Sequence, residues 1–166
     1  YFQDTMMRCR YSSIPVIVAP HGMTLGGGCE MTMHADRVVA AAESYIGLVE
    51  FGVGVIPGGG GSKEMALRAS DLFHKNDVEL NVLQEYFLAV AMAKVSTSAY
   101  EAFDTGVLQK GKDIVVVNKD RQIAVAKHVR VIACGQWPPG AIQRLQSLNV
   151  QCTKPRLPQL IGRLNG

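Results

Sequence analysis

The sequence predicts an α/β fold in which strands and helices alternate early and a helical region follows. Short apolar runs rich in β-branched residues, at 14–20 and 37–42, predict buried strands. Glycine-rich segments at 26–28 and 58–61 follow extended stretches and predict turns that open helices. Beyond residue 70, three further helices are expected against one extended segment, so the later part is expected to be mostly helical.

The extended elements are expected in four places: 14–20, 37–42, 45–49 and 113–118. Pro20, Gly22 and Gly26 predict that the first strand is followed directly by a turn. The expected helices lie at 3–12, 27–35, 62–70, 77–94, 98–103 and 119–133. Ser62 is the expected N-cap of its helix. The helix at 77–94 carries apolar residues at helical spacing, which predicts a stripe facing the core: Leu80, Leu83, Phe87 and Val90.

The composition predicts one globular domain, because 48% of the 166 residues are hydrophobic and 19% are charged. We assign residues 1–135 to this domain and 136–166 to a basic segment without an assigned structure. No run of eighteen apolar residues occurs, so no transmembrane helix is expected. The first residue is not Met and no secretory signal is recognisable, so we expect a fragment of a cytoplasmic protein.

Charge is distributed unevenly along the chain. Residues 1–120 hold ten Lys or Arg and fourteen Asp or Glu, a net charge of −4, whereas 121–166 hold seven Lys or Arg and no acid, a net charge of +7. The basic end could bind an anionic partner or form a solvated tail. Aromatic residues do not alternate with these charges, so nucleic-acid binding is not expected. Four widely spaced cysteines favour reduced thiols and give no spacing for a metal site.

The most informative pattern combines the glycine-rich turn with Glu30 and, twenty residues later, Glu50. A helix from Gly27 travels about 13 Å outward, at about 1.5 Å per residue. The strand at 37–42 returns up to about 20 Å, so both carboxylates are expected near the same end. Two carboxylates in unlike environments can serve as acid and base. The backbone N–H groups at the start of the helix can stabilise an oxyanion.

Structural interpretations of these residues stay open at this point. The glycines could serve turn geometry, and Glu30 could be a solvated acid in a first helical turn. Cys29, at the helix N-terminus, could be a reactive thiol or a buried small apolar residue. His34 lies four residues after Glu30 and could tune that carboxyl or make a structural hydrogen bond. Four methionines could line an acyl pocket or fill the core: Met31, Met33, Met65 and Met92.

Several other glycine-rich motifs are incomplete. A lipase-type hydrolase needs Gly-x-Ser-x-Gly, and the segment 60–64 has Glu64 at the last position. A phosphate loop needs Gly-Lys-Ser/Thr, whereas the order here is Ser62-Lys63. Gly52 and Gly54 are followed by Pro57 and not by the third glycine of a dinucleotide-binding fingerprint. A dehydrogenase activity is therefore not expected within these residues.

The combination resembles the signature of the crotonase (enoyl-CoA hydratase/isomerase) superfamily. The segments that carry this resemblance are 15–22, 25–30, 36–40, 46–50 and 56–61. It covers residues 14–70 strongly and 99–108 more weakly, and implies a partial crotonase-like fold built from ββα units. Segments 71–95 and 113–121 are most similar to the crotonase module joined to bacterial 3-hydroxyacyl-CoA dehydrogenases of fatty-acid β-oxidation.

The resemblance implies a role for each matching residue. Gly27 would supply one oxyanion-hole N–H, Glu30 would activate water and Glu50 would deliver a proton to the α-carbon. Four neighbours would bind substrate: Gly26, Gly28, Pro57 and Gly58. The substrate would be an acyl-CoA thioester, with no cofactor beyond its CoA and no metal. The implied assembly is a homotrimer or a covalent fusion to a dehydrogenase domain.

Two alternatives to a complete hydratase stay open. The family takes its second oxyanion N–H from an Ala-Gly-x-Asp-like loop, which does not occur in this sequence. A non-catalytic fragment acting in assembly is therefore the first alternative. The second is an enoyl-CoA isomerase, although the presence of both glutamates favours hydration, because many isomerases of the family keep one.

Overall fold

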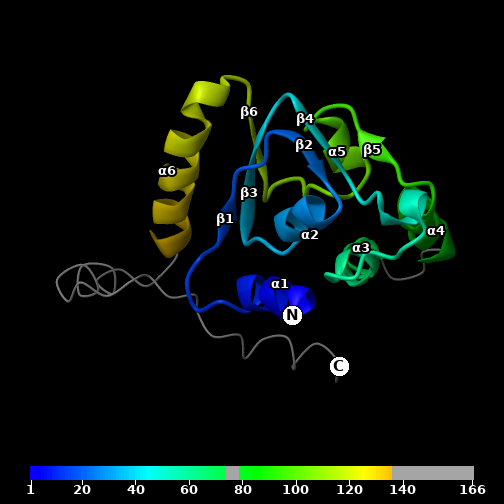
Figure 1. Ribbon diagram of the computed structural model, residues 1–166. Helices are drawn as coiled ribbons and strands as arrows, with labels where there is room; N and C mark the ends of the chain where they lie inside the picture. Colours follow the sequence, from blue (N-terminus) through cyan, green and yellow to red (C-terminus); the bar gives the residue numbers. More distant parts are fainter. Residues whose placement is uncertain (74–78, 136–166) are drawn as a thin grey trace.

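The computed structural model describes residues 1–73 and 79–135 and has a mixed α/β architecture. Two three-stranded sheets form its framework, with strand orders β1-β3-β6 and β2-β4-β5. Figure 1 shows helix α2 near the middle of the molecule, α6 standing beside the first sheet, and α3 and α4 on the opposite side. This arrangement confirms the predicted α/β class.

A strand-strand-helix unit occurs twice in succession. The first unit consists of β1 (Ile17–Val18), β2 (Gly22–Leu25) and α2 (Gly27–Met33). The second consists of β3 (Arg37–Ala41), β4 (Ser44–Gly47), the 3-10 helix η1 (Glu50–Val53) and α3 (Gly61–Ser70). The first strands pair in parallel in one sheet, as do the second strands in the other. The chain therefore returns to nearly the same place with each unit, as the predicted ββα units require.

The remaining elements extend and cover this framework. They are α1 (Phe2–Arg10), α4 (Glu79–Ala91), β5 (Val95–Ser96), α5 (Glu101–Asp104), β6 (Ile114–Val116), η2 (Lys119–Arg121) and α6 (Gln122–Gly135). Strand β6 joins β3 in parallel, whereas β5 joins β4 antiparallel. Helix α6 contacts β1 and β3, and Gln122 at its start donates to the carbonyls of Pro20 and Val39.

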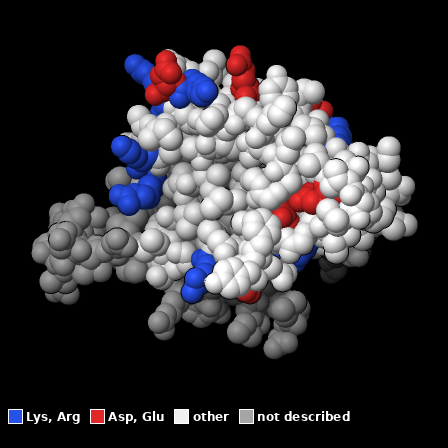
Figure 2. Space-filling view, in the orientation of Figure 1, with Lys and Arg blue, Asp and Glu red and all other residues white. Residues whose placement is uncertain are grey.

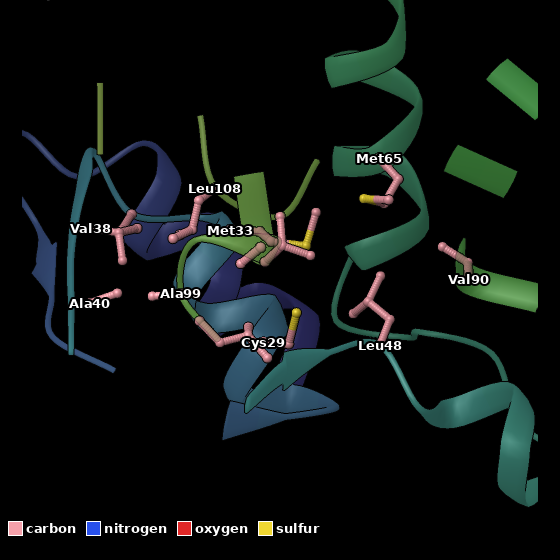
Figure 3. Close-up of a cluster of buried hydrophobic side chains, with 13 residues drawn as sticks. Cys29, Met33, Val38, Ala40, Leu48, Met65, Val90, Ala99 and Leu108 are labelled. Atoms are coloured by element: carbon pink, nitrogen blue, oxygen red, sulfur yellow. The ribbon is translucent and has the colours of Figure 1, made fainter. Parts of the chain in front are cut away.

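The hydrophobic core surrounds α2 (Figure 3). Cys29 and Met33 of this helix are fully buried and lie between the two sides of the cluster. Val38 and Ala40 of β3 pack on one side, and Leu48, Met65 and Val90 lie on the other. Close packing on several sides fixes α2 in the molecule, and with it the glycine-rich turn at its start.

The prediction that a turn directly follows the first strand is wrong. The predicted strand at 14–20 shortens to Ile17–Val18, and Gly22–Leu25 forms the separate strand β2. Gly22 has a φ of +59°, a backbone conformation that glycine adopts without strain, and it begins pairing with Ser44. The glycine therefore redirects the chain into the second sheet instead of ending the extended structure.

The predicted cap at Ser62 is also wrong. Helix α3 begins at Gly61, its N-cap is Gly60, and Ser62 lies exposed within the first turn. Gly60 has a φ of +105°, and a Cβ at this position would lie 3.1 Å from Nε2 of His34. A serine cap is unnecessary, because the side chain of Glu30 reaches the N-terminus of α3 from another helix.

The predicted core-facing stripe on α4 is wrong for three of its four residues. Val90 is buried, whereas Leu80 and Phe87 are about two-thirds exposed and Leu83 is also exposed. The face that packs includes Tyr86 and Ala89. A Cβ at Gly106 would lie 2.5 Å from Cζ of Tyr86, so the missing side chain makes room for that ring. Both faces of this helix are apolar, and tertiary fit selects between them.

Other sequence predictions agree in outline or fall outside the described residues. The helix predicted at 119–133 divides into η2 and α6. The basic segment 136–166 and the start of the helix predicted from 77 are not described. Within the described ranges, no helix is both long and apolar enough to cross a bilayer. On the face shown in Figure 2, Lys and Arg lie in separate small groups rather than in one continuous patch.

Candidate active site

The fold brings Glu50, from the second ββα unit, to the N-terminal end of α2, the helix of the first unit that carries Glu30. Glu30 lies in the first turn of α2, and Glu50 is the first residue of η1, directly after the strand returns. Oε1 of Glu50 lies 3.5 Å from the position that a Cβ would take at Gly26, the N-cap of α2. The out-and-back path expected from the helix and strand lengths is therefore what the structure contains.

Glu30 is an almost completely buried acid, with 1% of its surface exposed. Its Oε1 accepts a hydrogen bond of 2.9 Å from the backbone N–H of Gly61, at the start of α3. Burial raises the pKa of the Glu30 carboxyl, and the carboxylate of Glu50 raises it further, against the N–H groups of Gly61, Gly59 and Gly60. The carboxylate is thus held by backbone dipoles in a poorly solvated place, which makes it a stronger base than an exposed glutamate.

Glu50 has a different environment. Its side chain is half-buried, and within the described part of the chain its buried Oε2 has no hydrogen-bond partner. A buried carboxylate oxygen usually has a donor, so this atom is available to a ligand or to a proton. The two acids therefore differ, as an acid/base pair requires: one is fixed by backbone N–H groups and the other has an unused oxygen.

The glycine-rich turn adopts a conformation that suits close approach to its backbone. Gly26 has φ 53° and ψ −122°, and its N–H donates to the carbonyl of Gly47 across the second sheet. Gly27 and Gly28 are the first two residues of α2. Helix geometry gives the N–H groups at such positions no partner within the helix. The first turn of α2 thus contains Glu30 and N–H groups without a partner inside the helix, and Glu50 lies beside its N-cap Gly26.

The second glycine-rich loop, at residues 57–61, packs against the side chain of Glu30 on α2. A Cβ at Gly59 would lie 2.5 Å from Oε2 of Glu30, and one at Gly61 would lie 3.1 Å from Cγ of Glu30. Pro57 is buried, and its Cβ lies 3.0 Å from the position that a Cβ would take at Gly61. Gly58 is exposed, and a Cβ there would meet only the carbonyl oxygen of Ile56, at 3.8 Å. Pro57 supports the loop, and Gly58 borders open space.

Phe2 is a site residue that sequence reasoning missed. A Cβ at Gly27 would lie 2.8 Å from Cζ of Phe2, and one at Gly59 would lie 2.5 Å from its Cε1. The ring therefore rests against both glycine segments at the place where they face Glu30. The sequence around Phe2 has no motif, and an aromatic residue in a short helix gives no sign of where its ring will pack.

A second group of charged residues lies behind Glu30, around the buried Glu64. Oε1 of Glu64 lies 2.8 Å from Nζ of Lys63 and 3.7 Å from both Nε of Arg10 and Nε2 of His34. Burial raises the pKa of Glu64, but the hydrogen bond from Lys63 and the positive charges of Lys63 and Arg10 outweigh it and hold the pKa below its usual value.

His34 takes the structural role of the two left open by the sequence. Its Nδ1 lies 2.7 Å from the carbonyl oxygen of Glu30, which can only accept, so Nδ1 donates. Nε2 then accepts from Nζ of Lys63 at 3.3 Å. Burial lowers the pKa of His34, which agrees with a neutral ring carrying its proton on Nδ1.

The structure also decides between the interpretations of Cys29 and of the four methionines. Cys29 is completely buried, and burial raises the pKa of its thiol far above the usual value, so it acts as a small core residue. Met33 and Met65 belong to the core, whereas Met31 and Met92 are exposed. Among the described residues, no group of three or more His, Cys, Asp or Glu is placed to hold a metal ion. The groups that the structure places together at this site are two carboxylates and backbone N–H donors.

Comparison with known proteins gives a consistent result. Residues 1–71 match the family model for enoyl-CoA hydratase/isomerase. Over 128 residues the chain is 48% identical to a "Probable 3-hydroxyacyl-CoA dehydrogenase" of Bacillus subtilis, which covers 77% of this chain and 16% of that protein. It is 45% identical over 51 residues to a "Crotonyl-CoA hydratase" of Syntrophomonas wolfei, covering 31% of this chain and 20% of the relative.

A solved structure extends the comparison to the fold. The chain resembles a "putative enoyl-CoA hydratase" from Streptomyces avermitilis with a TM-score of 0.62 and 27% identity, over 90% of this chain and 48% of that one. The described fold is thus part of the fold of these enzymes. The chain spans about half of this solved chain and less than a fifth of the Bacillus protein.

Proposed function

Because the chain belongs to the enoyl-CoA hydratase/isomerase (crotonase) superfamily, we propose that it forms the hydratase site of a fatty-acid β-oxidation polypeptide that also contains a 3-hydroxyacyl-CoA dehydrogenase. The substrate is a 2-enoyl-CoA thioester and the product a 3-hydroxyacyl-CoA. The observation that carries this proposal is the environment of Glu30: a buried carboxylate with Oε1 bonded to Gly61 and Glu50 close by.

In the proposed reaction, Glu30 is the base. Its Oε1 stays bonded to the N–H of Gly61, and Oε2 accepts a proton from water as the water oxygen forms a bond to C3. The raised pKa of Glu30 favours this proton transfer, because a more basic carboxylate takes a proton more readily. Helix α3 holds the carboxylate through its first N–H, so little reorganisation is needed during the reaction.

The other two groups complete the addition. As the bond to C3 forms, the electrons of the C2–C3 double bond move toward the thioester and place negative charge on its oxygen. The N–H of Gly27 donates to that oxygen. Glu50 is protonated when the substrate binds and delivers this proton to C2, which restores the thioester carbonyl. The proton that Glu30 took from water then returns to Glu50 through solvent, so both acids are regenerated and the sum of the steps is the addition of one water molecule. Gly26, Gly28, Pro57 and Gly58 line the path of the thioester and its CoA, with no further cofactor.

A second candidate is isomerisation of an enoyl-CoA through the same enolate. One observation favours it: Glu30 is engaged in capping α3, which would leave Glu50 as the acid/base group. The two reactions differ in their products, because isomerisation moves the double bond and adds no oxygen. Product analysis by mass spectrometry therefore separates them, since hydration increases the mass by that of one water.

The assembly is part of the proposal. A homotrimer or a covalent dehydrogenase partner would cover exposed apolar residues such as Leu80, Phe87 and Met92 on α4. A cytoplasmic location follows from the same assignment. Sedimentation of the full-length protein tests the oligomeric state.

The test of function uses the full-length protein and crotonyl-CoA. We expect conversion to 3-hydroxybutyryl-CoA, and a Glu50→Gln variant slower by about 100-fold or more, which is typical of a lost general acid or base. A variant at a distant exposed acid, Asp104→Asn, should keep the wild-type rate. Formation of a double-bond isomer in place of the hydroxy product would favour the second candidate. A full-length protein that converts no enoyl-CoA would leave the non-catalytic alternative.

A further inference from the structure

Phe2 fills space that two glycines leave open. Its Cζ and Cε1 lie 2.8 Å and 2.5 Å from the positions that Cβ atoms would take at Gly27 and Gly59. Cβ contacts below 3.0 Å do not occur in ordinary packing, so the ring can lie here because both residues lack a side chain. The first residue of α1 thus contacts both glycine segments of the site.

The ring is also a neighbour of the reactive oxygen of Glu30. The same Cβ position at Gly59 lies 2.5 Å from Oε2 of Glu30 and 2.5 Å from Cε1 of Phe2. Oε2 is the oxygen that does not bind the N–H of Gly61. Half of the Phe2 surface is exposed, whereas Glu30 is buried, so the ring lies between this carboxylate and the outside. An aromatic wall therefore borders the place where Oε2 can meet a substrate.

Helix α1 holds this wall in position. Met6 packs into the protein with 4% of its surface exposed. At the other end of the helix, Nε of Arg10 lies 3.7 Å from Oε1 of the buried Glu64 on α3. A hydrophobic anchor and an ion pair thus connect α1 to the elements that carry Glu30 and its capping N–H, and the position of the ring is fixed relative to both.

From these contacts we infer that Phe2 is a specificity-determining residue that limits the size of the substituents on C3 of the substrate. The inference rests on the proposed function, in which Oε2 of Glu30 directs water to C3. The substituents of C3 must then lie next to Oε2, in the space that the ring borders. A 2-enoyl-CoA with one alkyl group on C3 fits beside the ring, and one with two alkyl groups on C3 collides with it.

The test compares two substrates that differ by one methyl group on C3, crotonyl-CoA and 3-methylcrotonyl-CoA. The ratio of their kcat/KM values is measured for the wild type, Phe2→Ala, Phe2→Leu and the control Tyr11→Ala, an exposed aromatic residue just after α1. We expect Phe2→Ala to shift the ratio toward the branched substrate by about tenfold or more, the usual effect of one methyl group in a tight pocket. Phe2→Leu should shift it less, and Tyr11→Ala should not shift it.

A binding experiment keeps this inference separate from the proposed function. Dissociation constants of the saturated thioesters butyryl-CoA and 3-methylbutyryl-CoA, measured by calorimetry, should show the same shift in Phe2→Ala without any chemistry. If the wild type hydrates neither substrate, the proposed function fails, while the binding ratio still tests the role of Phe2. An unchanged binding ratio overturns the inference, as do equal changes for both substrates, which would mean that Phe2 is a general obstruction. Circular dichroism checks that each variant folds. If Phe2→Ala does not fold, the comparison is made with Phe2→Leu.

Discussion

Glu30 and Glu64 are both buried to 1% exposure, yet their surroundings differ in kind. Glu64 lies among positive groups, with Nζ of Lys63 at 2.8 Å and Nε of Arg10 at 3.7 Å. Glu30 has backbone N–H groups and a second carboxylate, Glu50, in place of a cation. Their pKa values accordingly shift in opposite directions, raised for Glu30 and lowered for Glu64.

This difference predicts that Glu64 serves the stability of the fold and that Glu30 serves the reaction. Removing a buried carboxylate that cations compensate is destabilising, because the cations are left without their partner. A buried carboxylate without a cation is costly to keep ionised, and structures tend to retain such groups where a proton must be moved. Substitutions at the two positions should therefore affect different properties of the protein.

The largest expected effect is on catalysis. Glu30→Gln should lower the rate of crotonyl-CoA hydration by about 100-fold or more, because the amide cannot accept the proton of water. Glu64→Gln should keep the rate within about threefold at a temperature where it is folded, since its carboxylate binds cations behind the site. Steady-state rates of the two variants check this. A larger loss in Glu64→Gln than in Glu30→Gln would reverse the assignment of the two acids.

Stability should respond in the opposite order. Glu64→Gln should lower the free energy of unfolding by about 1–3 kcal/mol, because Lys63 and Arg10 lose their partner. Glu30→Gln should be neutral or slightly stabilising at pH 7, since the amide oxygen still accepts from the N–H of Gly61. Urea denaturation followed by circular dichroism measures both. Equal destabilisation by the two substitutions would show that both acids serve the fold.

A methyl group added at Gly59 should displace Glu30 or its neighbour Phe2 and leave Glu64 in place. In Gly59→Ala the new Cβ would lie 2.5 Å from both Oε2 of Glu30 and Cε1 of Phe2, so one of these side chains must move. Both atoms are at the ends of side chains, which makes the shift inexpensive for folding. We expect on the order of a tenfold loss of kcat/KM, because small displacements of reacting groups are costly. The matched control is Ser62→Ala, an exposed position in the first turn of α3; a similar loss there would indicate a general effect of substitution in this segment.

The smallest effect is on the pH dependence of stability. The pKa of Glu30 rises on folding, so its contribution is complete below the ordinary value of 4.5 and is lost as pH rises through the raised value. The pKa of Glu64 falls on folding, so its contribution is present above 4.5 and is lost as pH drops through the lowered value. Relative to wild type, Glu30→Gln should gain stability as pH rises above 4.5. The deficit of Glu64→Gln should shrink on acidification, and urea titrations across this range test both signs.

The sequence contains enough information for the ββα plan and for the meeting of Glu30 with Glu50, because element lengths fix where the chain returns. It does not reveal which face of α4 packs, since both faces are apolar and the choice depends on the room that Gly106 leaves for Tyr86. The same limit applies to Phe2 and to the cations around Glu64. Their positions depend on how α1 packs against α3, and no local pattern in the sequence encodes that contact.

The N-cap of α3 shows most clearly what local sequence patterns do not reveal. Local rules select Ser62, whereas the described structure uses the carboxylate of Glu30, thirty-one residues away from Gly61 in the chain. A catalytic candidate thus also satisfies a helix N-terminus, which a reading of short segments cannot anticipate. Sites of this kind are where local preferences and the final structure are expected to differ.

Whether Glu30 and Glu50 act together in one addition step is measured by a double-mutant cycle on crotonyl-CoA hydration. Rates are compared for the full-length wild type, Glu30→Gln, Glu50→Gln and the double variant. Each single substitution should lower the rate by about 100-fold or more, and the double variant should be at most about tenfold slower than either, because the effects of residues that act as a unit are not additive. Losses that multiply in the double variant, or a single variant within tenfold of wild type, would contradict this joint action.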